Sequence, residues 1–250
     1  MDWALTLSGF VVGALVGLTG VGGGALMTPV LVVGFGIPPL VAVGTDLVFA
    51  AATKSLGVLA HARRAAVDWR LVGLMALGSL PASLATIRFL HDGSARGLDI
   101  GPWVETALGA ALVLTALALL WRRPGPAADA PVPRRAAWTV AAGALLGFLV
   151  TLTSVGAGAL GVVLLSLLHP RLSTPRVVGA DLAHAVPLAA LAGAGHWQLG
   201  NVDGTLLAAL LLGSLPGIWL GARLAHGLSE RLTRPLLAAV LTAIGIKLIA

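Results

Sequence analysis

The sequence predicts an all-α polytopic membrane protein, on the basis of its composition, the length of its apolar segments and an internal repeat. Of its 250 residues, 58% are hydrophobic and only 10% are charged, and the mean hydropathy is +0.97. A soluble domain carries roughly a quarter charged residues, so this chain cannot cover a water-facing surface. Only helices and closed barrels span a bilayer, and the apolar runs lack the alternation of barrel strands. Helices are therefore expected.

Eight apolar segments follow one another along the chain. They cover approximately residues 4–34, 38–60, 70–88, 102–121, 137–168, 176–195, 204–222 and 235–249. One helical span needs about 20 residues. The segments 4–34 and 137–168 exceed that length, and glycines interrupt each of them near its middle. Each is predicted to be a single broken span or a hairpin of two half-helices.

The net charge of +6 does not indicate a nucleic-acid partner. The arginines lie mainly in short connections between apolar segments, where positive charge sets orientation. The expected surroundings are therefore a lipid bilayer. The N-terminus lacks a basic region, so a cleaved signal peptide is not expected. The glycines at 17–24 resemble a dinucleotide fingerprint only loosely and follow no strand, so no cofactor is expected.

A proline-rich basic linker over residues 122–136 separates two copies of one pattern, residues 1–121 and 137–250. The matched stretches include Val-Gly-Thr-Asp-Leu at 43–47 with Val-Gly-Ala-Asp-Leu at 178–182, and Gly-Ser-Leu-Pro at 78–81 with 213–216, both at an offset of 135. Upstream, 13–17 is matched with 143–147, and 19–26 with 153–160. The order and spacing predict two homologous halves. Pro81 and Pro216 are expected to kink equivalent helices.

The distribution of positive charge favours halves of opposite orientation. If all eight segments cross once, the basic residues outside segment 38–60 divide eight to seven between the two sides. If 4–34 and 137–168 are hairpins, all except Arg88, Arg96 and Lys247 lie on one side, a division of 12 to 3. Membrane proteins carry such a bias. We therefore expect inverted repeats, each with a glycine-broken (re-entrant or discontinuous) first segment plus three transmembrane helices.

The two glycine-rich breaks are the first candidate for a substrate site. Glycine lets the chain leave a helix and lets a ligand approach the backbone, and a half-helix that starts there directs free N–H groups into the membrane. The candidate substrate-binding residues at the breaks are Thr19, Gly20, Gly22, Gly23, Gly24, Thr153, Ser154, Gly156 and Gly158. The alternative is tight helix packing, which is the expected role of Gly9, Gly13 and Gly17.

Asp46 and Asp181 occupy equivalent positions several residues inside apolar segments. A carboxylate in the centre of a span costs about 2.5–3.5 kcal/mol on insertion scales, so it tends to be paired, hydrated or functional. One interpretation is coupling of transport to protons or cations. The other is that each side chain caps or braces the neighbouring broken helix. The sequence leaves both open.

Two basic side chains share these segments. Lys54 lies two turns beyond Asp46 and is replaced by Ala189 in the second half. Its ammonium could extend to the interface or supply positive charge to an anion. His184 follows Asp181 by three residues, on the same helix face; it is interpreted as a hydrogen-bonded buried histidine or as a coupling residue. The other histidines are expected at the interface, and no metal site is expected.

These motifs resemble the sulfite exporter TauE/SafE family of bacterial membrane proteins. The resemblance rests on residues 17–25, 43–47 and 78–81 and their second-half counterparts, and covers nearly the whole chain. It implies carriage of small sulfur-containing or organic anions, such as sulfite and sulfonates, coupled to the proton gradient. Ala180 replaces threonine in the second aspartate motif. Any role of the Thr45 hydroxyl therefore applies to one half.

The expected function is a secondary transporter that binds a small anion between the two breaks and rocks one half against the other. No ATP-hydrolysing motif is present, and no His, Asp or Ser constellation indicates an enzyme. An anion channel without ion coupling is the main alternative. A passive assembly factor is disfavoured because structural spans do not need two glycine-broken segments. Assembly into a homo-oligomer is left open.

Overall fold

The computed structural model describes residues 3–19, 24–61, 67–121, 132–224 and 230–249. Within these ranges every regular element is a helix. The elements are α1 (Trp3–Thr19), α2 (Gly24–Pro29), the π-helix η1 (Val30–Gly34), α3 (Pro39–His61), α4 (Trp69–Ala95), α5 (Gly101–Leu120), α6 (Val132–Thr153), α7 (Ala159–Leu168), α8 (Thr174–Gln198), α9 (Gly204–Leu224) and α10 (Glu230–Ile249). Helix α6 begins at Val132, four residues before the predicted end of the linker at residue 136.

Among the residues that the structure describes, five helices are long and apolar enough to cross a membrane by length and composition, namely α4, α5, α8, α9 up to Gly221 and α6 from Arg135. Shorter apolar helices correspond to α1, to α2 with η1, and to α7. Large apolar side chains such as Leu7, Leu77 and Phe89 are exposed on the outer surface. A lipid environment accommodates such a surface. The prediction of a multi-pass helical membrane protein is confirmed.

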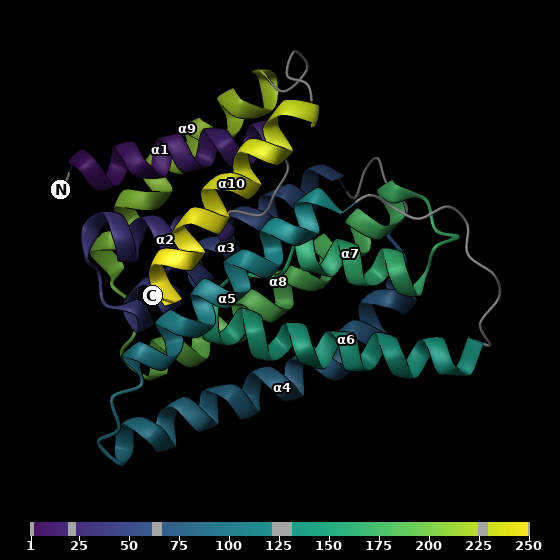
Figure 1. Cartoon of the computed structure of the whole chain (residues 1–250), viewed down its shortest axis with the longest axis horizontal. Coiled ribbons are helices and arrows are strands. Elements are labelled where there is room, and N and C mark those ends of the chain that lie inside the picture. Colours follow the sequence, from purple (N-terminus) through teal and green to yellow (C-terminus); the bar gives the residue numbers. More distant parts are fainter. Residues whose placement is uncertain (1–2, 20–23, 62–66, 122–131, 225–229, 250) are drawn as a thin grey trace.

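The two halves are interlocked (Figure 1). Helix α1 packs against α9 at one edge of the molecule, and α6 packs against α4 at the opposite edge, so the first helix of each half contacts the other half. Helices α3 and α8 pack together, as do α5 and α10. Glycines permit the close approach at the two edges, because a Cβ on Gly13 would meet Ser214 and one on Gly147 would meet the backbone of Ser79. The predicted packing role of Gly13 is confirmed.

The contacts at the two edges follow the same register. Gly9 lies against Leu210 in the way that Gly143 lies against Met75, just as Gly13 and Gly147 contact equivalent serines. Gly13 is therefore the counterpart of Gly147. The sequence match of 13–17 with 143–147 was wrong by one helical turn, because glycines repeat every four residues on both helices and local similarity cannot choose between adjacent turns.

The relative directions of packed helices follow from which residues lie next to one another. In the α5–α10 pair, Gly109 lies near Ile249, whereas Val113, one turn later, lies near Gly245. The residue numbers run in opposite directions, so these equivalent helices are antiparallel. Along the α1–α9 edge, the residue numbers of both helices increase in the same direction, so α1 is parallel to α9.

The second long segment is a hairpin. The Thr139 hydroxyl near the start of α6 lies 2.8 Å from Nε2 of His169, which follows the end of α7. At the turn, Gly156 lies against the side chains of Leu146 and Val150. Helix α7 thus folds back along α6, and the chain returns to the end where the segment began.

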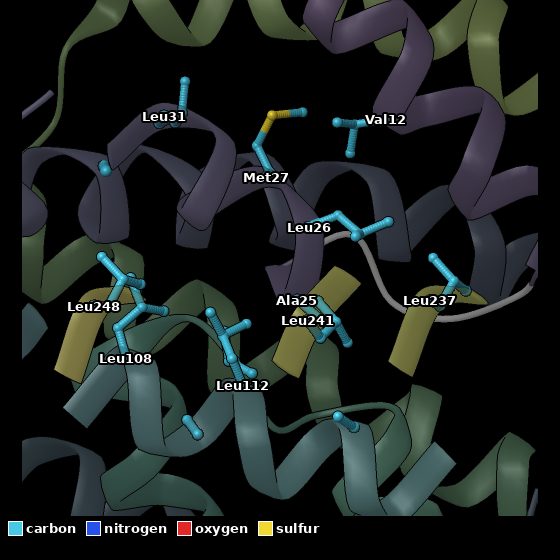
Figure 2. Close-up of a cluster of buried hydrophobic side chains, with 14 of the residues drawn as sticks. Val12, Ala25, Leu26, Met27, Leu31, Leu108, Leu112, Leu237, Leu241 and Leu248 are labelled. Atoms are coloured by element: carbon cyan, nitrogen blue, oxygen red, sulfur yellow. The ribbon is translucent and has the colours of Figure 1, made fainter. Parts of the chain in front are cut away.

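The half-helix of the first segment is held in a hydrophobic core made by both halves. Figure 2 shows Met27 of α2 and Leu31 of η1 in one cluster with Leu112 of α5 and Leu241 of α10. Met27 and Leu31 are fully buried. Burial of this kind positions α2 next to α3, which carries Asp46.

Candidate functional site

The break between α6 and α7 lies beside α8, and α3 reaches the same region because it packs against both α8 and α6. Ser154 has φ 59°, Gly156 has φ 127° and Gly158 has φ 122°. The last two values suit only glycine, and Ser154 occupies the left-handed region as a non-glycine residue. The sequence therefore ends α6 at Thr153 and starts α7 in a new direction.

The two hydroxyl groups at this break have different environments. Thr153 donates to the Leu149 carbonyl oxygen at 2.7 Å and accepts from the Val155 amide at 3.1 Å, so it is engaged by the chain itself. The Ser154 hydroxyl is buried and has no hydrogen-bond partner among the described residues. Of the two predicted hydroxyl donors, Ser154 is the one available to a ligand.

Asp46 on α3 is fully buried. Its Oδ2 accepts a hydrogen bond of 2.5 Å from the Thr28 hydroxyl on α2, the half-helix that follows the first break. Its Oδ1 finds no partner in the described part of the chain. The Ser154 side chain lies close enough to interact with this carboxylate, although it lacks hydrogen-bond geometry. Asp46 therefore braces α2 and still offers one free oxygen.

Asp181 on α8 makes an equivalent contact with α7. The Gly158 amide interacts with its carboxylate, and a Cβ on Gly161 would collide with Oδ1. The carboxylate thus lies over the first turn of α7, where the helix dipole favours negative charge. Its buried Oδ1 also has no hydrogen-bond partner among the described residues. Asp46 is thus hydrogen-bonded to α2, Asp181 lies against the start of α7, and each carboxylate has an oxygen without a partner among the described residues.

Lys54 extends from α3 into the second break. Its Nζ donates to the Ala157 carbonyl oxygen at 3.3 Å, and its charge interacts with Asp46, Asp181 and His184. Lys54 is half-buried, and its ammonium is directed at the break between α6 and α7. The Lys54 ammonium was expected either to extend to the membrane interface or to supply positive charge to an anion. The geometry favours the second interpretation, a positive charge inside the protein.

His184 is fully buried on α8. Its Nε2 lies 2.7 Å from the Ser79 hydroxyl of α4, and its Nδ1 has no partner within the described ranges. The predicted hydrogen-bonded histidine is confirmed in geometry. The free Nδ1 keeps a proton-transfer role open.

Sequence reasoning missed two contributors and misplaced a third residue. Thr28 and Ser79 were not singled out, although Ser79 recurs as Ser214 in the duplicated Gly-Ser-Leu-Pro motif. His196 was expected at the interface, and this is wrong. It is fully buried, with its Nε2 donating to the Thr151 carbonyl oxygen at 2.9 Å, because the face of α8 that carries it packs inward.

The first break is described only at its edges. Gly20, Gly22 and Gly23 lie outside the described residues, whereas Thr19 ends α1 and Gly24 starts α2. The predicted meeting of the two breaks therefore stays a prediction. What the structure places together is the second break with Asp46, Asp181 and Lys54.

This polar centre is asymmetric although the sequence motifs around it are repeated. Lys54 corresponds to Ala189, and His184 corresponds to Phe49. The centre holds two carboxylates and one ammonium inside the protein, so it is one positive charge short of balance when all three are ionised. An uncompensated charge in a membrane interior is costly. The arrangement is suited to exchange protons and to hold a small ion beside Lys54 and Ser154.

Comparisons with known proteins match nearly the whole chain to membrane transporters. The sequence profile described as "Sulfite exporter TauE/SafE" matches residues 5–248. Over 256 residues the chain is 39% identical to the "Probable membrane transporter protein YjnA" of Bacillus subtilis (strain 168), covering 100% of both chains. It is 29% identical to a "Probable membrane transporter protein" of Xylella fastidiosa (strain 9a5c), covering 97% of this chain and 92% of the relative. No solved structure matches the chain significantly.

Proposed function

The chain belongs to the sulfite exporter TauE/SafE family of membrane transporters, and we propose that it is a secondary transporter that moves a small anion across the bacterial cytoplasmic membrane together with protons. The substrate class is a sulfur oxyanion or organic anion such as sulfite or a sulfonate. The observation that carries this proposal is the position of Lys54, whose ammonium donates to the Ala157 carbonyl oxygen at a helix break and whose charge interacts with the buried Asp46 and Asp181.

The anion binds beside Lys54 and the Ser154 hydroxyl. Lys54 supplies the positive charge, and Ser154 is a buried hydroxyl with no partner among the described residues. The start of α7 adds the partial positive charge of a helix N-terminus, the arrangement by which broken helices hold anionic groups in transporters. A small oxyanion offers several acceptor oxygens to such a set of donors.

Protons accompany the anion because of charge balance. An anion that enters this centre adds negative charge close to Asp46 and Asp181, and like charges at short range in a medium of low dielectric repel strongly. Protonation of a carboxylate removes that repulsion. Asp46 and Asp181 are therefore the coupling residues, and the free Nδ1 of His184 is a further proton acceptor on the same helix face as Asp181.

The moving units are two bundles that mix the halves. One is built around the α1–α9 pair, with α3 in contact with α9, and the other contains α6, α4 and α8; α3 also packs against α8, at the boundary between the two bundles. Rocking one half of the sequence against the other would separate α1 from α9 and α4 from α6. Movement between the bundles instead requires sliding at the α3–α8 and α5–α10 interfaces. The polar centre lies at the first of these, so the motion would change its access.

The halves have opposite orientations in the membrane. The antiparallel α5–α10 pair supports this, as does the cavity that Arg70, Arg135 and Arg171 line together at one end of the molecule. The sequence has no cysteine, so single substitutions can be labelled selectively. Arg70→Cys and Arg171→Cys should react from one side and Asp99→Cys from the other. Labelling of the first two from opposite sides would contradict the arrangement.

The transport proposal is tested by flux into proteoliposomes. Labelled sulfite and small sulfonates should show saturable uptake that responds to an imposed pH gradient. Asp46→Asn or Asp181→Asn should abolish the response to the gradient, whereas Asp99→Asn, an exposed control that keeps its acceptor oxygen for the Gly101 amide, should retain it. Flux that neither saturates nor responds to the gradient would identify a channel instead.

A further inference from the structure

A second polar site lies at one end of the molecule, outside the central site. It is a cavity of about 220 Å³ formed where α4 and α6 begin and where α7 connects to α8. Its lining residues are Asp68, Arg70, Leu71, Leu74, Arg135, Ala136, His169, Arg171 and Leu172. Helix α7 spans ten residues between the break and this cavity, which corresponds to about 15 Å. The two sites are therefore distinct.

The cavity is positively charged. Three arginines line it, against one aspartate. Asp68 is already engaged, because its Oδ1 accepts hydrogen bonds from the Arg70 and Leu71 amides at 3.1 and 3.2 Å as the N-cap of α4. Arginine binds phosphate and carboxylate groups through paired N–H donors. The chemistry of the lining thus selects an anionic group with several oxygens.

His169 stays a neutral donor in this cavity. The Thr139 hydroxyl donates to the Arg135 carbonyl oxygen at 2.7 Å, so Nε2–H of His169 donates to the hydroxyl oxygen at 2.8 Å. Burial, and then the nearby Arg135, hold the pKa of His169 below its usual value. The positive charge of the cavity therefore comes from its arginines.

Two tryptophans place this cavity at the depth of the lipid headgroups. Trp69 starts α4 and is 68% exposed, and Trp138 lies in the first turns of α6 and is 63% exposed. Exposed tryptophans at helix ends mark the membrane–water interface. Basic pockets between helices at this depth hold the headgroups of anionic lipids. Leu71 and Leu74 add an apolar wall suited to the start of an acyl chain.

We infer that this cavity is a binding site for a phosphate group, supplied by the headgroup of an anionic phospholipid. The guanidinium groups of Arg70, Arg135 and Arg171 hold the phosphate oxygens. Because the ligand contacts α4, α6 and the α7–α8 connection together, its binding stabilises the bundle that these helices form. Free inorganic phosphate shares the same chemistry, and the experiment separates the two sources.

The test compares the thermal stability of the full-length protein in three settings. These are detergent with added inorganic phosphate, nanodiscs of zwitterionic phosphatidylcholine, and nanodiscs that also contain cardiolipin or phosphatidylglycerol. We compare Arg135→Gln and the double variant Arg70→Gln/Arg171→Gln with the wild type. Arg96→Gln is the matched control, because it removes an exposed arginine at the opposite end of α4.

Anionic lipid should raise the melting temperature of the wild type and of the Arg96→Gln control. Each pocket arginine removed should weaken lipid binding about fivefold, as measured by titration of the lipid. A saturable shift with inorganic phosphate alone, lost in the same variants, would assign the site to free phosphate. Equal responses in Arg135→Gln, Arg96→Gln and the wild type would overturn the inference. A variant that no longer folds is recognised by size-exclusion chromatography. In that case the same pocket arginines are replaced by lysine, which keeps the charge and removes the paired N–H donors of the guanidinium group.

Discussion

The hydrogen bond between Thr28 and Asp46 allows a quantitative test of how the half-helix α2 is held. The bond is 2.5 Å long and joins two fully buried side chains. Thr28→Val removes the hydroxyl and keeps the shape of the side chain. A hydrogen bond to a charged group contributes about 1.5–3 kcal/mol, and a change of 1 kcal/mol shifts the melting temperature of a 150–250-residue domain by about 2–4 °C. Thr28→Val should therefore melt roughly 3–12 °C below the wild type.

A double-mutant cycle assigns that loss to this particular bond. Thr28→Val is combined with Asp46→Leu, and the melting temperature of all four proteins is measured by intrinsic fluorescence in detergent. If the bond is the cause, Thr28→Val should have a much smaller effect once Asp46 is leucine. Thr28→Ser, which keeps the hydroxyl, should retain most of the stability.

The same substitution should also reduce proton-coupled flux, because Asp46 would lose the partner that orients it. Equal effects of Thr28→Val in the Asp46 and Asp46→Leu backgrounds would refute the reasoning. So would a Thr28→Ser protein as unstable as Thr28→Val.

Three further outcomes are expected. Gly147→Ala should lower the melting temperature, because its Cβ would meet the α4 backbone and overpacking costs about 1–3 kcal/mol. The control Gly73→Ala should not lower it, since no described atom lies within 4 Å of the added Cβ. Lys54→Met should reduce saturable anion flux about tenfold or more, since the proposed charge-assisted hydrogen bond from the ammonium to the anion is lost. The exposed Lys247→Met serves as the control, and equal fluxes would exclude Lys54 from the site. Because the pKa of His169 is lowered by burial, the unfolded chain binds its proton first and stability should fall as pH drops below about 6.5. His169→Gln should flatten that slope in melting curves between pH 7.5 and 5, and an unchanged slope would contradict the assignment.

The sequence predicted the membrane class, and it also predicts the duplication, because both depend on features that recur along the chain. Apolar length identifies a span wherever it packs, and a motif such as Val-Gly-Thr-Asp-Leu repeats at a constant offset. The interlocking of α1 with α9 and α6 with α4 could not be predicted. Glycines at four-residue spacing mark a packing face, but they do not identify the helix that will cover it.

The residues of the candidate site also fall into those that the sequence could predict and those that it could not. Asp46, Asp181 and Lys54 stand out because charges inside apolar segments are costly. Thr28 and Ser79 do not, because a hydroxyl within a helix can bond to its own backbone and therefore gives no signal of a distant partner. His196 was misplaced for a related reason. Its position near the end of a segment describes its depth along α8, and says nothing about which face of the helix it occupies.

The exchange of first helices between the halves has a consequence for synthesis of the protein. The packing partner of α1 is α9, which ends at Leu224, so α1 leaves the ribosome about 200 residues before its partner is complete. At 5–20 residues per second this delay lasts about 10–40 s. During that time the glycine face of α1 must contact lipid or the insertion machinery. The α4–α6 edge closes as soon as Thr153 has been made, so one bundle can assemble while the other still waits for the end of the chain.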